Sequence, residues 1–446
     1  MLPIGFKRLT KFNFNPPQLL AIAFILSMVL GTILLKLPIA TSQAISWVDA
    51  LFTATSAITV TGLITVDTGS AYTLFGEIVI LVLIQLGGLG VMTIAVLIYI
   101  MLGKKIGMRQ RLIIQQALNQ PSVGGVIRLV KKVVYYSLVI EGVAACFLAL
   151  DWGPQFGWGK GIYYSLFHSV SAFNNAGFSI WSNSLMSFVN DPVVNIVITI
   201  LFIMGGVGFT VLAELWGGHD FHRLSLHTKL MVTGTVILTI LSMIVVFILE
   251  YNNPNTIGPM STPEKMWASY FQAVTPRTAG FNTLDTGGLS HATQFFIMIL
   301  MFIGAGSAST GGGIKLTTFI VLLLSTLAFL QGRKDITVFQ RTIKFRIVQK
   351  SLALTMLSML FVSLSAFILT ITEHSAPFLE IMFEVISAFG TVGLSMGLTP
   401  ELSVIGKLVV VIIMFCGKIG PLTLAFSFAK SRTANIRYPE SDVLTG

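Results

Sequence analysis

Four segments of this 446-residue sequence share one short pattern, in which an apolar stretch leads into small or hydroxyl residues, a glycine and an apolar residue. Glycine permits the unusual backbone dihedrals that turn carbonyl oxygens toward a common point, and carbonyl oxygens can replace the hydration shell of a cation. The side chains before each glycine carry no formal charge, so backbone dipoles would select the ion. The candidate ion-binding residues are Thr59, Val60, Thr61, Gly62, Asn174, Asn175, Ala176, Gly177, Thr278, Ala279, Gly280, Gly390, Thr391, Val392 and Gly393.

These glycines recur at nearly constant spacing, with intervals of 115, 103 and 113 residues between Gly62, Gly177, Gly280 and Gly393. A second glycine cluster follows each of them by about 25 residues, beginning at Gly87, Gly205, Gly304 and Gly417. Taken singly, each cluster is typical of a close-packing face between membrane helices, and this interpretation is compatible with the repeat. Because the loop glycines and the second glycine clusters recur together four times, the sequence predicts four units. Each unit consists of a spanning helix, a short re-entrant helix with a glycine-ended loop, and a second spanning helix.

The composition places these units in a membrane, because 54% of the residues are hydrophobic, only 10% are charged and the mean hydropathy is +0.85. A cytosolic enzyme and a disordered protein are therefore excluded. The first apolar run could also be a secretory signal cleaved near Ser42, but it is too long for one and the repeat requires it as a helix. Cys146 and Cys416 lie in separate apolar runs and are expected to be buried thiols. The long apolar runs lie near 17–39, 74–102, 133–150, 192–216, 229–250, 291–330, 349–372 and 403–429.

Basic residues orient the predicted helices, because 21 of the 28 lysines and arginines fall on one side if the N-terminus is cytoplasmic. Both termini are then cytoplasmic in a multi-pass plasma-membrane protein, and the re-entrant segments enter from outside. The net charge of +10 serves orientation and lipid headgroups, not nucleic acid. The expected division is 1–102 for the first unit, 103–131 for a cytoplasmic linker, 132–217 for the second unit, 218–330 for the third, 331–348 for a second linker, 349–430 for the fourth unit and 431–446 for a cytoplasmic tail.

One apolar run, 291–330, is interrupted by a glycine-rich segment that cannot form a stable helix, because each glycine costs about 1 kcal/mol relative to alanine. We expect a loop in mid-membrane, and the alternative is a tightly packed kinked helix. Lys315 and Lys418 lie within predicted spans and must face a cavity or find acidic or carbonyl partners, although Lys315 could instead extend to the cytoplasmic surface. Glu141 is a further buried charge for which the sequence offers no evident partner. The segment consists of Gly304, Ala305, Gly306, Ser307, Ala308, Ser309, Thr310, Gly311, Gly312 and Gly313.

The four loops, the string from Thr275 to Phe281 and the segment from Gly304 to Lys315 together resemble the Trk/Ktr/HKT superfamily of potassium transporters. The resemblance covers nearly the whole chain and is strongest to membrane subunits of bacterial Ktr systems. It implies an all-α fold with four units around one pore, as in tetrameric potassium channels, and a homodimer with one pore per subunit. It also implies a cytosolic ring of nucleotide-binding regulatory subunits, a gate at residues 304–313, and a role at that gate for Lys418, where relatives usually have arginine.

The same resemblance favours K+ as the substrate, because potassium-permeable relatives have glycine in all four loops, whereas serine in the first marks many sodium-selective ones. Only residues 59–63 approach the potassium-channel string, so Na+ or mixed transport is the alternative. The chain is expected to bind no cofactor, with K+ as substrate and Na+ as a candidate co-activator. No catalytic constellation or resident metal site is expected, and a helix bundle with a purely structural role gives no reason for four re-entrant loops. The basic loops at 104–132 and 333–350 are expected to dock the regulatory ring or to contact membrane lipids.

Overall fold

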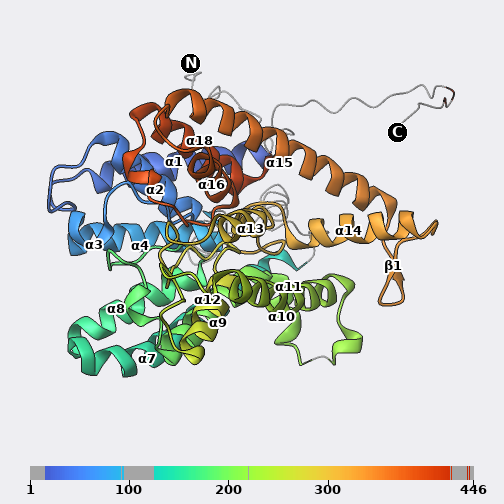
Figure 1. The fold of residues 1–446 in the computed structure, drawn as a ribbon, viewed down its shortest axis with the longest axis horizontal. Helices are drawn as coiled ribbons and strands as arrows, with labels where there is room; N and C mark the ends of the chain where they lie inside the picture. Colours follow the sequence, from blue (N-terminus) through green and yellow to red (C-terminus); the bar gives the residue numbers. More distant parts are fainter. Residues whose placement is uncertain are drawn as a thin grey trace, which may run out of the picture.

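The computed structural model describes residues 16–91, 93–94, 125–218, 220–421, 423, 439 and 441. Helices make up most of these ranges, as the composition predicts (Figure 1). The predicted linker 103–131 lies outside the described residues up to residue 124. Most of the predicted tail 431–446 and the end of the apolar run 74–102 also lie outside them.

In the part of the chain that the structure describes, four long helices are apolar enough to cross a membrane. Each contains an 18-residue window with a mean hydropathy of 2.0 to 2.6, of which only 17–28% is buried inside the chain. At 1.5 Å per residue, 20 or more residues cover the roughly 30 Å of a hydrocarbon core. Their apolar outer faces are therefore suited to lipid. These helices are α1 (Pro16–Leu35), α7 (Val126–Phe156), α11 (Leu226–Glu250) and α15 (Phe345–Thr372).

Four shorter helices precede the repeated glycines, and we call them the loop helices. They have 13 to 16 residues, too few to span, and their C-terminal halves are buried. Polar caps start two of them, since Ser46 accepts a hydrogen bond from the Asp49 amide and Ser261 forms a capping box with Glu264. The loop helices are α2 (Trp47–Thr59), α8 (Trp158–Phe173), α12 (Thr262–Val274) and α16 (Phe378–Gly390).

Four return helices follow the glycines: α4 (Leu74–Leu89), α9 (Pro192–Val207), α13 (His291–Phe302) and α18 (Val404–Ile419). Three of them stop at a glycine with positive φ, namely Gly90, Gly208 and Gly420. The run predicted as one span over 192–216 is bent, because α10 (Phe209–Leu215) leaves α9 at an angle of 105°. The run 291–330 is broken between α13 and α14 (Leu316–Leu330) by irregular chain, so the kinked-helix alternative is wrong.

The remaining elements are small. α14 and α15 contact each other and converge on the antiparallel hairpin that joins them at the edge of the molecule, where Thr337 pairs with Thr342 (Figure 1). The small elements are α3 (Thr68–Ala71), η1 (Met186–Phe188), η2 (Phe221–Arg223), β1 (Thr337–Val338), β2 (Arg341–Thr342) and α17 (Leu398–Glu401).

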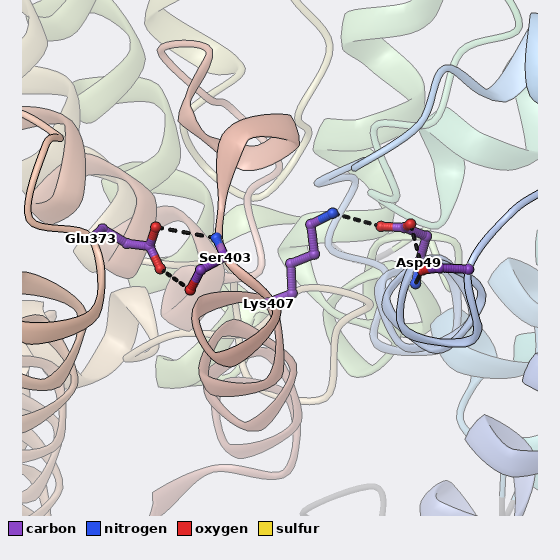
Figure 2. A network of polar contacts seen from close by, with 5 residues as sticks. Asp49, Glu373, Ser403 and Lys407 are labelled. Carbon is purple, nitrogen blue, oxygen red and sulfur yellow. Dashed lines mark hydrogen bonds and ion pairs between the residues drawn. The ribbon is translucent and has the colours of Figure 1, made fainter.

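Packing between successive parts of the chain closes a ring. α4 contacts α8, α9 contacts α12 and α13 contacts α16, so each return helix packs on the next loop helix along the chain. The last return helix, α18, packs on the first loop helix, α2. Figure 2 shows how Lys407 of α18 reaches Asp49 of α2, with 2.8 Å between Nζ and Oδ1, while the neighbouring Ser403 binds Glu373 at the end of α15. The first and the last of the four units thus contact each other and close the ring.

Candidate functional site

The four glycine loops, residues 60–63, 175–178, 278–281 and 391–394, have the same backbone conformation. In each loop the repeated glycine has a positive φ, between 67° and 93°. The residue two positions before it also has a positive φ, with values of 52° for Val60, 57° for Asn175, 69° for Thr278 and 50° for Thr391. This conformation is unfavourable for residues other than glycine, so its recurrence at four equivalent positions indicates a required geometry and not a local accident.

The four glycines lie in a closed ring in chain order. A Cβ added to any of them would collide with backbone of the next loop, and for the fourth glycine the next loop is the first. Such a Cβ on Gly62 would lie 2.5 Å from the carbonyl oxygen of Ala176. The ring therefore has no room for side chains at these positions. An added Cβ would approach a carbonyl oxygen of the next loop in every case. For Gly62, Gly177, Gly280 and Gly393 this oxygen belongs to Ala176, Ala279, Val392 and Thr61, respectively.

In the residue before each repeated glycine, the amide donates a hydrogen bond, whereas the carbonyl oxygen accepts none from the described residues. The amides of Thr61, Ala176 and Val392 donate to carbonyls of their own loop helices at 2.8–2.9 Å, and the amide of Ala279 donates to the carbonyl of Thr275, the residue after α12, at 3.0 Å. All four residues are fully buried. Among the residues that the structure describes, no donor reaches their carbonyl oxygens. Because buried carbonyls normally have partners, four free ones in a ring form a site suited to a cation.

Hydroxyl groups of the loop helices hold these loops, and sequence reasoning missed them. Ser56 accepts from the Gly62 amide at 3.0 Å and Ser387 from the Gly393 amide at 3.2 Å, while Ser171 donates to the carbonyl of Phe178 at 2.7 Å. In the third loop, Thr275 donates to the carbonyl of Phe281. A usable signal was present, since a serine stands six residues before the glycine in three of the four loops.

The glycine-rich segment 304–313 lies against the glycine loops. Thr310 donates to the Asn175 side chain at 2.7 Å, and the amide of Gly312 donates to the Thr391 hydroxyl at 2.8 Å. A Cβ on Gly311 would collide with Thr278. The segment therefore touches the positive-φ residue of the second, third and fourth loops.

Neighbouring backbone and two lysines fix the segment in this position. The amides of Gly306 and Thr310 donate to carbonyls at the end of α9, at 2.8 and 3.3 Å, and the carbonyl of Ala308 accepts from Phe209 at 2.9 Å. Lys418 donates to the carbonyl of Thr310, and Lys315 donates to that of Gly311 at 2.7 Å. Lys315 thus binds the segment and does not extend to the surface. Both lysines find carbonyl partners, as a buried ammonium requires.

The second set of glycines packs against the loop helices. Gly87, Gly205 and Gly417 leave no room for a Cβ next to the carbonyls of Ile58, Phe173 and Phe389, respectively. In each case that carbonyl belongs to the residue four positions before the loop glycine. The close-packing interpretation of these clusters is therefore confirmed in three units, and in the third unit Gly304 packs against Gly312 of its own segment.

Two other predictions need correction. Cys146 is exposed on the outer face of α7, because its helix presents that face away from the chain, whereas Cys416 is partly buried. Glu141 does have partners, which come from three elements and are described below. Neither outcome could be read from an apolar run, because the run does not say which helix face is covered.

Comparisons with known proteins agree with this arrangement. The sequence model of the TrkH family, described as cation transport protein, matches residues 6–436. Ktr system potassium uptake protein B from Bacillus subtilis is 58% identical over 434 residues, which are 97% of each chain. Potassium/sodium uptake protein NtpJ from Enterococcus hirae is 37% identical over 448 residues, or 99% of each chain.

Solved structures give the same fold. The crystal structure of the potassium transporter TrkH from Vibrio parahaemolyticus matches with a TM-score of 0.74 over 95% of this chain and 87% of that one, at 19% identity. The family consists of transporters and not of enzymes, and the apolar helices make this chain a multi-pass membrane protein. From its nearly full-length match to the family model and its 58% identity to a family member, this chain belongs to the TrkH family of cation transport proteins.

Proposed function

We propose that this chain is the ion-translocating subunit of a potassium uptake system and that K+ passes through the ring of glycine loops. One observation carries the proposal, namely the four buried carbonyl oxygens of Thr61, Ala176, Ala279 and Val392 that have no donor among the described residues. Oxygen atoms of neutral carbonyls suit a weakly hydrated monovalent cation, which they can release as well as bind. The nearly full-length similarity to a potassium uptake protein supports K+ as that cation.

Transport of Na+, alone or with K+, is the second candidate function. The observation that favours it is the similarity to a relative named a potassium/sodium uptake protein. The divergence of the last three loops from the first, at Asn175, Thr278 and Gly390, also separates this ring from a fully symmetric one. We assign K+ as the main substrate because all four loops have glycine, and we keep Na+ as a candidate co-activator.

The gate in this proposal is the segment 304–313 together with Lys418. The segment contacts three of the four glycine loops. Lys418 donates to its Thr310 carbonyl, and Lys315 donates to its Gly311 carbonyl. A glycine-rich break between α13 and α14 can change its dihedrals at less cost than packed helices can. Movement of the segment away from the loops would then open the path below the ring.

The proposed assembly follows the family pattern, with a homodimer in the plasma membrane, cytoplasmic termini and a cytosolic ring of nucleotide-binding subunits. The Ktr names of the relatives support a partner subunit. The hairpin between α14 and α15 projects from the body and carries exposed basic residues suited to that partner or to lipid headgroups (Figure 1). We retain four units over 1–102, 132–217, 218–330 and 349–430, joined by linkers at 103–131 and 331–348 and followed by the tail 431–446.

The test is ion uptake in bacteria that lack their own potassium transporters, with and without a cytosolic Ktr regulatory subunit. We expect growth at low K+ and saturable Rb+ uptake that depends on this chain. Gly280→Ala is expected to abolish uptake, because its Cβ would collide with the carbonyl of Val392. Gly397→Ala is the matched control, since Gly397 also has a positive φ but nothing within 4 Å of an added Cβ. Absence of K+ or Rb+ uptake with clear Na+ uptake would favour the second candidate function.

A further inference from the structure

A buried polar cluster lies behind the second glycine loop, and its side chains are not part of the ring of carbonyls. It joins Gln85 of α4, Glu141 of α7 and Asn174, the residue that follows α8. Glu141 is 3% exposed and Asn174 is fully buried. Three elements from two consecutive units therefore converge on one carboxyl group.

The hydrogen bonds within this cluster form a closed triangle. Gln85 Nε2 donates to both carboxyl oxygens of Glu141, at 3.1 and 3.2 Å. Asn174 Nδ2 donates to Gln85 Oε1 at 2.7 Å and to Glu141 Oε1 at 3.2 Å. Ser137 Oγ adds a further donor to Glu141 Oε1 at 3.3 Å. Position 141 must therefore accept every bond that it makes, whereas position 85 must donate on one side and accept on the other.

The triangle is directly connected to the ring of carbonyls. Asn174 precedes Asn175, which has a positive φ, donates to Thr278 at 3.2 Å and accepts from Thr310. Ala176, whose carbonyl oxygen belongs to the ring, is the next residue. A shift of Asn174 would therefore move the carbonyl of Ala176 relative to the third loop and to the segment 304–313.

Within the described ranges, the equivalent positions in the other loops have no tie to a carboxyl group. Thr59 and Asn174 both bond to their own helices, through the carbonyls of Thr55 at 2.7 Å and Val170 at 2.8 Å, and Arg277 bonds to Thr239 of α11 at 2.8 Å. Gly390 has no side chain. Of these four positions, only Asn174 is tied both to a carboxyl group and to a helix of the preceding unit, so the second loop is the one whose placement depends on a distant residue pair.

We propose that Glu141, acting through Gln85 and Asn174, is a positioning residue that sets the place of the second glycine loop and with it the preference for K+ over Na+. The inference rests on the proposed function, because it concerns the selectivity of the same ring. A ring of carbonyls distinguishes cations by the number and placement of its oxygens, and loss of one support changes that placement.

The decisive variants exchange donor and acceptor within the triangle. Glu141→Gln replaces one acceptor oxygen by an NH2 group that faces Gln85 Nε2, and Gln85→Glu directs one carboxyl group against another. Each single variant therefore leaves an unmatched contact between positions 85 and 141. The double variant Gln85→Glu with Glu141→Gln removes the mismatch, because the amide at position 141 then donates to the carboxylate at position 85, and Asn174 donates to an oxygen at both positions. We expect the ratio of Na+ to K+ KM values to fall about tenfold in each single variant and to return to within about twofold in the double variant, since one buried unmatched donor changes binding by about that factor.

A matched control makes the same chemical change elsewhere. Glu250 is also fully buried and accepts from the amide and hydroxyl of Ser290, at 3.0 and 2.7 Å, at the start of α13. Glu250→Gln is expected to lower thermal stability and to keep the wild-type KM ratio. A purely structural role of Glu141 would instead reduce the amount of inserted protein and the maximal rate, with an unchanged ratio.

The measurement is Rb+ and Na+ uptake by proteoliposomes with equal amounts of each folded variant. A wild-type ratio in Glu141→Gln, a failure of the folded double variant to recover, or an equal change in Glu250→Gln would each overturn this inference. A wild-type protein that takes up no K+ or Rb+ would instead overturn the proposed function, so the two failures are distinguishable.

Discussion

Replacement of Gly62 by serine tests how tightly the ring of carbonyls is built. Gly62 has a φ of 90°, and a Cβ at this position would lie 2.5 Å from the carbonyl oxygen of Ala176 and 3.2 Å from Cα of Gly177. The neighbouring backbone must shift, because neither atom belongs to a flexible side chain. Gly62→Ser therefore displaces one of the four carbonyls that we propose to bind K+.

Two costs contribute, and a control variant separates them. Holding a residue with a Cβ at positive φ costs about 1–2 kcal/mol wherever it occurs. Gly157 has a φ of 84° but nothing within 4 Å of an added Cβ, so Gly157→Ser carries this cost alone. The additional collision at Gly62 acts on the ring itself. Weakening one of four carbonyl contacts by about 1.4 kcal/mol corresponds to a tenfold change in affinity.

The assay is competition between K+ and Na+ for uptake into potassium-transport-deficient cells, with protein amounts determined by immunoblotting. We expect Gly62→Ser to reduce the preference for K+ about tenfold, and Gly157→Ser to lower thermal stability without a change in preference. Unchanged affinities for both ions in folded Gly62→Ser would refute the reasoning, because the ring would then tolerate a side chain where the structure leaves no room.

Three further predictions concern the gate, the partner surface and the closure of the ring. Deleting residues 307–309 is expected to raise flux and weaken dependence on the regulatory subunit with unchanged ion preference, and ordinary flux and regulation in an inserted deletion variant would place the gate elsewhere. Glu substitutions at Arg341, Lys344 and Arg346 together are expected to lose the regulatory subunit in pull-downs, whereas the exposed Lys160→Glu control keeps it; retained binding would favour a lipid contact. Partial burial raises the pKa of Asp49, but hydrogen bonds from Lys407 and Ser46 and the charge of Lys407 outweigh it and leave that pKa below its ordinary value of 3.8. The ion pair therefore stabilises the fold above about pH 4, where the Asp49 carboxyl is ionised, so Lys407→Met should lower the free energy of unfolding by about 1 kcal/mol at pH 7. In thermal unfolding, the difference from wild type should shrink as the pH falls below about 4. A difference that does not depend on pH would contradict this account.

The repeated elements could be predicted from the sequence because they depend on local composition. The spacing of Gly62, Gly177, Gly280 and Gly393 located all four loops, and the glycines from 304 to 313 predicted irregular chain between α13 and α14. In both cases the decisive property belongs to glycine itself. The backbone requirement is therefore visible without knowledge of the partners.

The support behind the loops could not be predicted in this way. Gln85, Glu141 and Asn174 are separated by 33 to 89 residues, and their contact depends on how α4, α7 and α8 pack. Glu141 therefore looked like an unpartnered charge. The partners of Lys315 and Lys418 were hidden for the same reason, since they are carbonyls of the segment 304–313, which carry no sequence signature.

The most direct test of the central claim is a high-resolution structure of the purified protein with Rb+ or Tl+ in place of K+, in which anomalous or difference density locates the ion. The account predicts density on the axis of the ring, within coordination distance of the carbonyl oxygens of Thr61, Ala176, Ala279 and Val392. The intensity of this density should decline only when Na+ is present in large excess over Rb+. An empty ring, with the ion bound instead at side-chain oxygens elsewhere in the chain, would contradict the claim that these four carbonyls form the ion-binding site.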